Sequence, residues 1–149
     1  MKKNLYLFAF FLVFFSCTNR EVSPGAGTET IEKFSSKKEN GRWTTNSAMA
    51  EQLRAMDATL ENFTLLNKKK YENLKAYQQF ASFFMDHVNL LRSVPLDDGE
   101  ARNSLYAKLD SLEAQSKIML GSDMNASSTA LKVTNSVFSQ IRSAFNFDF

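Results

Sequence analysis

Apolar side chains from Ser47 onward recur at alternating spacings of three and four residues, the repeat of a helix that buries one face. The first series is Met49, Leu53, Met56, Leu60 and Phe63. In phase with it, a second series comprises Leu74, Tyr77, Ala81, Phe84, Val88 and Leu91. Two later series comprise Leu105, Leu109, Leu112 and Met119, and then Ala130, Val133, Val137, Ile141 and Phe145. The repeat predicts an all-α domain over residues 47–149.

The repeat is interrupted at three places, which predict where helices end. A polar gap, Asn67 to Lys70, separates the first two series. Pro95 ends the second helix, because the residue before a proline is driven out of helical geometry. Asp97-Asp98-Gly99-Glu100 resembles a capping box, with Asp97 as the expected cap of the third helix. Gly121 is expected to end that helix in the left-handed conformation.

Two architectures satisfy this pattern. If the chain turns at Asn67–Lys70 and again at Gly121, the four segments form an up-down four-helix bundle. If Ser47–Val94 is instead one helix, continuous through Asn67–Lys70, the domain is a long antiparallel helical hairpin that dimerises to cover its apolar stripe. We favour the four-helix bundle, and a homodimer remains the alternative.

The charge balance argues against a nucleic-acid partner. The formal net charge of +2 includes Lys2 and Lys3; removing them from the 18 basic residues leaves 16, equal to the 16 acidic residues. A nucleic-acid binder would need a basic excess or a clustered basic face. The densest basic run is only three residues, Lys68 to Lys70.

The N-terminus has the order of a secretory signal peptide. Two lysines precede an apolar run of eleven residues, Leu5 to Phe15, and Ser16 then precedes Cys17, the one cysteine of the chain. A helix of eleven residues is about 16 Å long, too short for a bilayer core of about 30 Å. Residues 1–17 resemble a bacterial lipoprotein signal peptide, and that resemblance implies cleavage after residue 16.

The resemblance further implies a lipid anchor on Cys17: a thioether-linked diacylglycerol and an N-linked acyl chain such as palmitate. Two or more chains anchor a protein stably where one does not. Thr18 after the cysteine is similar to the pattern that directs lipoproteins to the outer membrane. The alternatives are an uncleaved N-terminal anchor and an ordinary secretory peptide. The expected location is the cell envelope, facing the periplasm.

Residues 17–46 are predicted to be a tether, since they are rich in Ser, Thr, Gly, Glu and Lys and bury little apolar surface. A coil of the 29 residues after Cys17 would hold the domain roughly 30 Å from the membrane. Its apolar exceptions are Ile31, Phe34 and Trp43. We expect Ile31 and Phe34 on one side of a short helical turn and Trp43 against the end of the domain; the alternative is a motif that docks a partner.

No pattern in the sequence indicates catalysis or a cofactor. His87 is the one histidine, and zinc and di-iron sites require ligand sets that the chain does not provide. Serine-hydrolase and phosphate-binding motifs are also missing from the sequence. We therefore predict a protein that is not an enzyme and holds no metal and no cofactor.

Two aromatic groups are candidate binding features. Tyr77, Phe80, Phe83, Phe84 and His87 make the second helix apolar over a surface wider than one stripe. They could form its core face, or a face for a partner or ligand. Phe145, Phe147 and Phe149 alternate just past the last helix, either folded over the bundle or inserted into a partner as a docking tail.

We thus predict a membrane-anchored interaction or assembly module that binds an envelope protein. The alternative is a carrier of a small apolar or haem-like ligand inside the bundle.

Overall fold

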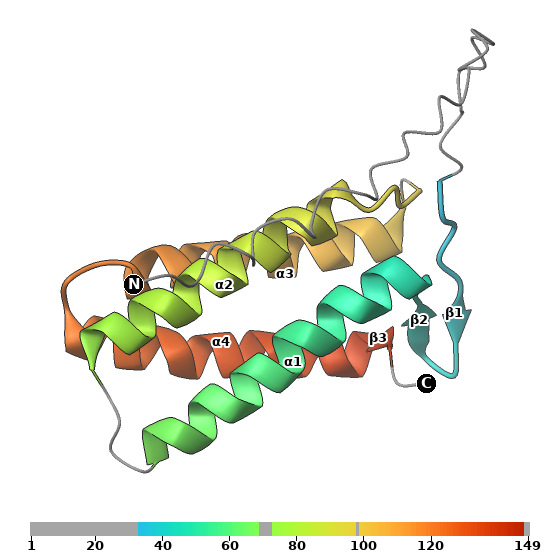
Figure 1. The fold of residues 1–149 in the computed structure, drawn as a ribbon. Coiled ribbons are helices and arrows are strands. Elements are labelled where there is room, and N and C mark those ends of the chain that lie inside the picture. Colours follow the sequence, from blue (N-terminus) through green and yellow to red (C-terminus); the bar gives the residue numbers. More distant parts are fainter. Residues whose placement is uncertain (1–32, 69–72, 98, 148–149) are drawn as a thin grey trace, which may run out of the picture. The chain divides into compact units, whose positions relative to one another are not determined.

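The computed structural model describes residues 33–68, 73–97 and 99–147, and within them the protein is a bundle of four helices (Figure 1). The helices are α1 (Ser47–Lys68), α2 (Leu74–Ser93), α3 (Glu100–Met119) and α4 (Met124–Ala144). Consecutive helices pack against each other, which confirms the predicted helical bundle.

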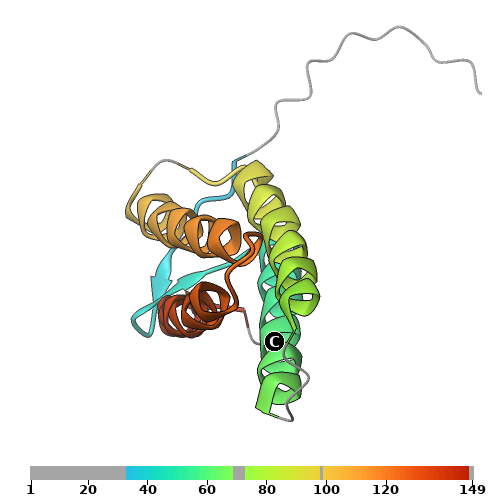
Figure 2. The ribbon, with the colours of Figure 1, turned by 90° about the vertical axis from the view of Figure 1, so that its left-hand side faces the viewer.

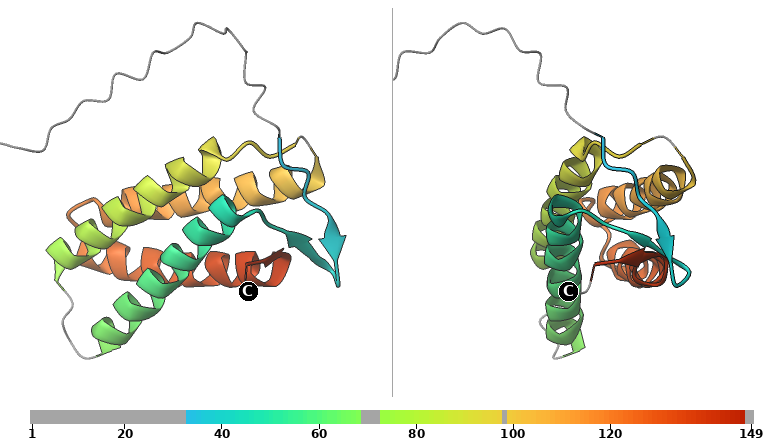
Figure 3. Two further views of the ribbon diagram at one scale, coloured as in Figure 1. Left: turned by 45° about the vertical axis from the view of Figure 1, so that its right-hand side comes forward. Right: turned by 90° about the vertical axis from the view of Figure 1, so that its right-hand side faces the viewer.

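The first two helices cross the last two obliquely. In Figure 1, α1 lies in front of α4 and α2 in front of α3. Figure 2 looks nearly along α3 and α4 and shows them on one side of the body, with α1 and α2 on the other. The C-terminal turns of α1 extend past α4 in Figures 1 and 3.

The single long helix of the alternative architecture is wrong. Asn73, which precedes α2, has extended backbone angles, and its side-chain oxygen accepts a hydrogen bond from the Ala76 N–H at 2.9 Å. An asparagine in this position starts a helix rather than continuing one. Asn46 and Asp123 cap α1 and α4 in the same way. Lys69 and Lys70 lie outside the described residues.

Both ends of α3 are capped differently from the prediction. The cap of α3 is Gly99 and not Asp97, because the Asp97 N–H donates to the Phe34 carbonyl in the bridge between Phe34 and Leu96. Gly121 does follow the end of α3, but without a positive φ. The Gln78 side chain of α2 satisfies the carbonyl there instead, at 3.1 Å from the Gly121 oxygen.

The core is built around aromatic rings of α2. Tyr77 and Phe84 are fully buried, and Phe80 is 4% exposed. Phe63 of α1 stacks on Phe80 with ring centroids 4.5 Å apart, and Phe138 of α4 meets Phe84 at 6.3 Å. The apolar stripes lie largely as predicted, except that Val133 is 38% exposed and buried Thr134 takes its place. Thr134 can be buried because its hydroxyl donates to the Ala130 carbonyl.

Residues 33–46, which the sequence analysis assigned to the tether, belong to the folded body. They contain β1 (Lys38–Glu39) and β2 (Arg42–Thr44), which pair as a hairpin through Asn40-Gly41. Both turn residues have positive φ, 50° and 81°, as an Asn-Gly hairpin turn requires. Trp43 is half-buried against the core, as expected.

Phe34 is not part of a helical turn. Its N–H donates to the Pro95 carbonyl at 2.7 Å, and its carbonyl accepts from the Asp97 N–H at 3.0 Å. This bridge fixes the chain on the connection between α2 and α3 (Figure 3). Ile31 lies outside the described residues.

The C-terminal tail folds back onto the body. β3 (Phe145–Asn146) pairs in parallel with β2, completing a sheet of order β1-β2-β3. Phe145 is fully buried and Phe147 is 1% exposed, with its ring 6.4 Å from that of Phe138. Phe145 and Phe147 are therefore core residues and not a free docking tail, because the pairing with β2 turns both rings inward. Phe149 lies outside the described residues.

Arg42 joins the hairpin to the end of α4. Its guanidinium donates to the Arg142 carbonyl at 2.7 Å and to the Phe145 carbonyl at 2.6 Å. Arg142 lies in the last turn of α4, where carbonyls lack partners within the helix, and Phe145 is its C-cap residue. Arg142 in turn binds Asp57 and, at 3.2 Å, Glu61 of α1. The two ends of the described chain are thus held together by hydrogen bonds.

Replacing Arg42 with Gln should destabilise the protein by about 1–3 kcal/mol, because charge-assisted bonds to two half-buried carbonyls are lost. Chemical denaturation followed by circular dichroism measures the change. Lys132→Gln, at an exposed position of α4, is the matched control and should change stability little. Equal stability of the two variants would show that Arg42 does not hold the C-terminus.

Replacing Phe147 with Ala should cost about 3–5 kcal/mol, since a fully buried ring leaves a cavity. The melting temperature should fall accordingly. An unchanged melting temperature would contradict the buried position of the tail and would restore the docking alternative.

Candidate functional site

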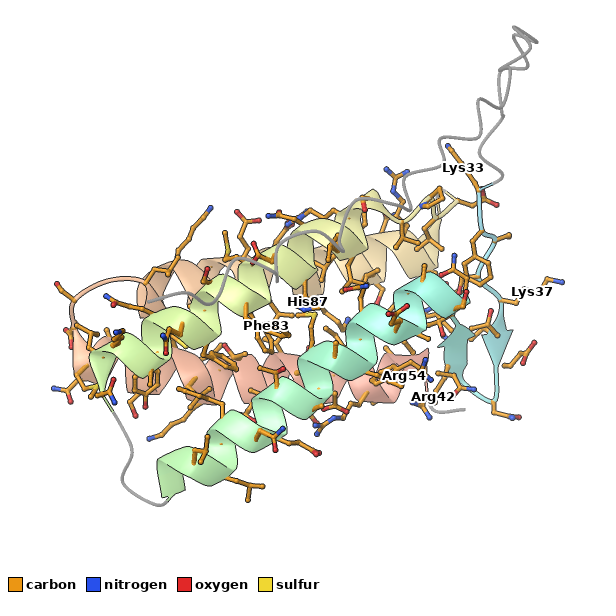
Figure 4. The ribbon with its side chains drawn as sticks, viewed as in Figure 1. Lys33, Lys37, Arg42, Arg54, Phe83 and His87 are labelled. Atoms are coloured by element: carbon orange, nitrogen blue, oxygen red, sulfur yellow. The ribbon has the colours of Figure 1, made fainter. Side chains whose placement is uncertain are left out.

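The predicted aromatic face divides into a buried part and a surface part. Tyr77, Phe80 and Phe84 belong to the core, so they form no partner or ligand surface in this fold. Phe83 and His87 are half-buried, because each lies one position off the buried stripe. Figure 4 shows both side chains on α2 in the region beside α1. Only these two of the five predicted residues reach the surface.

A third residue, Leu90, extends this surface. Positions 83, 87 and 90 lie on one face of α2, since residues three and four apart are neighbours on a helix. Leu90 is 49% exposed, a large value for a leucine. We call Phe83, His87 and Leu90 the α2 stripe. The sequence pattern already places all three residues on the flank of the buried stripe, but it does not show how far each one is exposed.

His87 is fixed by contacts on two sides. Its Nδ1 lies 2.7 Å from Oε1 of Gln52 on α1, and its ring centroid is 4.1 Å from that of Phe83. Gln52 can accept from an Nδ1–H, so the geometry fits the neutral tautomer protonated at Nδ1. In that tautomer Nε2 is a hydrogen-bond acceptor.

Burial lowers the pKa of His87 below its usual value of 6.5, and the neighbouring Asp86 carboxylate opposes this effect. Desolvation disfavours the charged imidazolium, which explains the direction. At neutral pH the α2 stripe is therefore an uncharged surface of two rings and a leucine.

Other large apolar side chains are exposed near the C-terminal ends of α1 and α3. Leu65 and Leu66 of α1 are 57% and 50% exposed, in the turns that extend past α4. Ile118 and Leu120 at the end of α3 are also exposed. The sequence repeat assigned none of these four residues to a stripe, so it gave no reason to expect them in the core.

The described residues offer neither a metal centre nor a membrane-spanning segment. No group of three or more His, Cys, Asp or Glu side chains within residues 33–68, 73–97 and 99–147 is placed to hold a metal ion. None of the helices described is long and apolar enough to cross a bilayer. Cys17, the predicted lipidation site, and the predicted signal peptide, residues 1–16, lie outside the described residues.

Comparison of the chain with protein-family models, with curated proteins and with solved structures finds no match. The features that bear on function are therefore the N-terminal pattern and the surface of the helical body.

The lowered pKa of His87 predicts that the protein loses stability as the pH falls from about 7.5 to 5.5. In the unfolded chain the histidine takes up a proton near pH 6.5, whereas in the folded chain it stays neutral to a lower pH. The unfolded state therefore binds more protons over this range, and the melting temperature should fall. Melting curves of the wild type and of His87→Gln at both pH values measure the effect. An equal pH dependence in both proteins would show that His87 does not contribute.

Proposed function

We propose that this protein is a lipid-anchored, non-enzymatic protein of the bacterial cell envelope, whose helical body binds another envelope protein. The observation that carries the proposal is the order of residues 1–17: a charged start, a short apolar run, Ser16 and Cys17. Cleavage after residue 16 would expose Cys17 for acylation, and Thr18 favours transport to the outer membrane. The body would then face the periplasm.

The α2 stripe supports a role in binding a protein. Aromatic side chains are enriched in the cores of protein interfaces, where they supply large rigid contact areas. Phe83 and His87 are held in place by each other and by Gln52, so little side-chain entropy is lost on binding. A partner of matching chemistry offers an apolar side chain to Phe83 and Leu90 and a hydrogen-bond donor to His87.

The alternative function, a carrier of a small apolar or haem-like ligand, has less support. Its ligand would lie inside the bundle, beside the aromatic rings of α2. Those rings pack against one another instead: Phe80 lies 4.5 Å from both Phe63 and Phe84, measured between ring centroids. A ligand would have to displace one of these rings.

Lipidation is tested by intact-mass analysis of the full chain produced with its own N-terminus in a bacterial host. We expect the wild type in the membrane fraction, with the mass of a chain that begins at Cys17 and carries acyl groups. Cys17→Ser should remove the acyl mass and prevent membrane retention of the processed chain. A wild-type chain with an unmodified Cys17 would overturn the proposal.

The binding role is tested by replacing Leu90 with Gln, which should abolish chemical cross-linking to an envelope partner seen with the wild type. Ile118→Gln is the matched control, because Ile118 is similarly exposed, at 44%, on another helix. Both substitutions are at exposed positions and should leave the melting temperature nearly unchanged. Identical cross-linking patterns for the two variants would exclude the α2 stripe as the binding surface.

A further inference from the structure

The segment that carries the β1–β2 hairpin is basic, although Asp97 lies beside it through its hydrogen bond to Phe34. Residues 33–44 contain four Lys or Arg and one Glu, a formal charge of +3. Residues 45–149 contain 11 Lys or Arg and 12 Asp or Glu, a formal charge of −1. The hairpin segment therefore carries an excess of positive charge, whereas the rest of the chain after it is close to neutral.

Three lysines of this segment are exposed: Lys33, Lys37 and Lys38. Figure 4 shows Lys33 and Lys37 extending away from the helices. The Lys38 ammonium lies 5.2 Å from the centroid of the Trp43 ring. Arg42 is used differently, since its guanidinium binds the two carbonyls at the end of α4. We call Lys33, Lys37 and Lys38 the lysine surface.

The lysine surface lies where the N-terminal segment joins the body. The bridge of Phe34 to Pro95 and Asp97 fixes the chain one residue after Lys33. Lys33 is 16 residues after Cys17, and even a fully extended chain of that length spans at most about 58 Å. A lipid on Cys17 would keep Lys33 within that distance of the bilayer at all times.

From this placement we infer that the lysine surface is a contact site for the anionic headgroups of phospholipids in the membrane that holds the anchor. The inference rests on the proposed lipid anchor. Juxtamembrane lysines are attracted to anionic lipids over about one Debye length, near 10 Å at 0.1 M salt. The attraction of three lysines is weak for a free protein, but the anchor makes the contact intramolecular and raises its effective concentration.

The segment between the anchor and Lys33 does not share this charge. Residues 18–32 contain one Arg and three Glu, a formal charge of −2. Anionic lipids therefore repel this segment and attract the body beyond it. The contact would orient the body with its hairpin toward the membrane.

Trp43 is a natural probe of this contact, because it is the one tryptophan of the chain and lies beside Lys38. The full chain, extracted from membranes, is reconstituted into vesicles of phosphatidylethanolamine with or without phosphatidylglycerol. Each vesicle also carries lipids with a spin label in the headgroup, which quench tryptophan fluorescence at short range. We expect stronger quenching of Trp43 in vesicles that contain phosphatidylglycerol. That excess should be lost in 1 M salt, where the Debye length is about 3 Å.

The variant Lys33→Gln/Lys37→Gln/Lys38→Gln should lose the excess quenching. Its matched control is Lys75→Gln/Lys117→Gln/Lys132→Gln, which removes the same charge from exposed positions on α2, α3 and α4 and should keep it. The inference is overturned if Trp43 is quenched equally in both kinds of vesicle, or if the two variants show the same excess quenching. The lysines would then be better explained as a contact site for an acidic protein. Flotation of the vesicles separates the two proposals: a wild-type chain that does not float with any vesicle overturns the lipid anchor itself.

Discussion

The burial of the aromatic rings of α2 is the constraint on which the rest of the fold depends. Phe80 and Phe84 reach α1 through Phe63 and α4 through Phe138, so α2 contacts both helices with one continuous group of rings. Polar contacts such as Arg142 with Asp57 also join α1 and α4. Surface ion pairs contribute little stability. The position of α1 therefore depends on apolar packing, in which the rings of α2 and the buried Met49, Leu53 and Met56 of α1 take part.

The hairpin and the C-terminal tail close one end of this core. β2 pairs with β3 across about a hundred residues of sequence, and Arg42 binds carbonyl oxygens at the same place. Neither strand would be stable alone, since each has only two or three residues. Their pairing is possible because the helices bring Trp43 and Phe145 to the same end of the body, where Phe145 is fully buried and Trp43 is half-buried. The short sheet is thus a consequence of the helical packing.

The helical repeat was enough to predict the four helices, because burial of one face is recorded locally at every third or fourth residue. The sheet was missed, although Asn40-Gly41 is a hairpin signal, because its flanking residues are mostly polar. The prediction that Asp97 caps α3 was wrong because the Asp97 N–H binds the Phe34 carbonyl, and a contact between residues so far apart in sequence is not visible in a local pattern. For the candidate site, the sequence identified Phe83 and His87 among five residues, but only packing shows which of the five are enclosed.

The hydrogen-bonded bridge at Phe34 determines where the proposed anchor would be attached to the body. If the tether joined the body through a mobile segment, every face of the bundle would be presented equally to other proteins. The hydrogen bonds of Phe34 to Pro95 and Asp97 instead fix the point of attachment at the connection between α2 and α3. A body held at that end keeps the exposed Leu65 and Leu66 of α1 away from the attachment point, whereas Leu90 of the α2 stripe lies in the last turn of α2, next to it. Under the proposed lipid anchor, the place where the chain enters the fold would therefore decide which faces of the body a partner could reach.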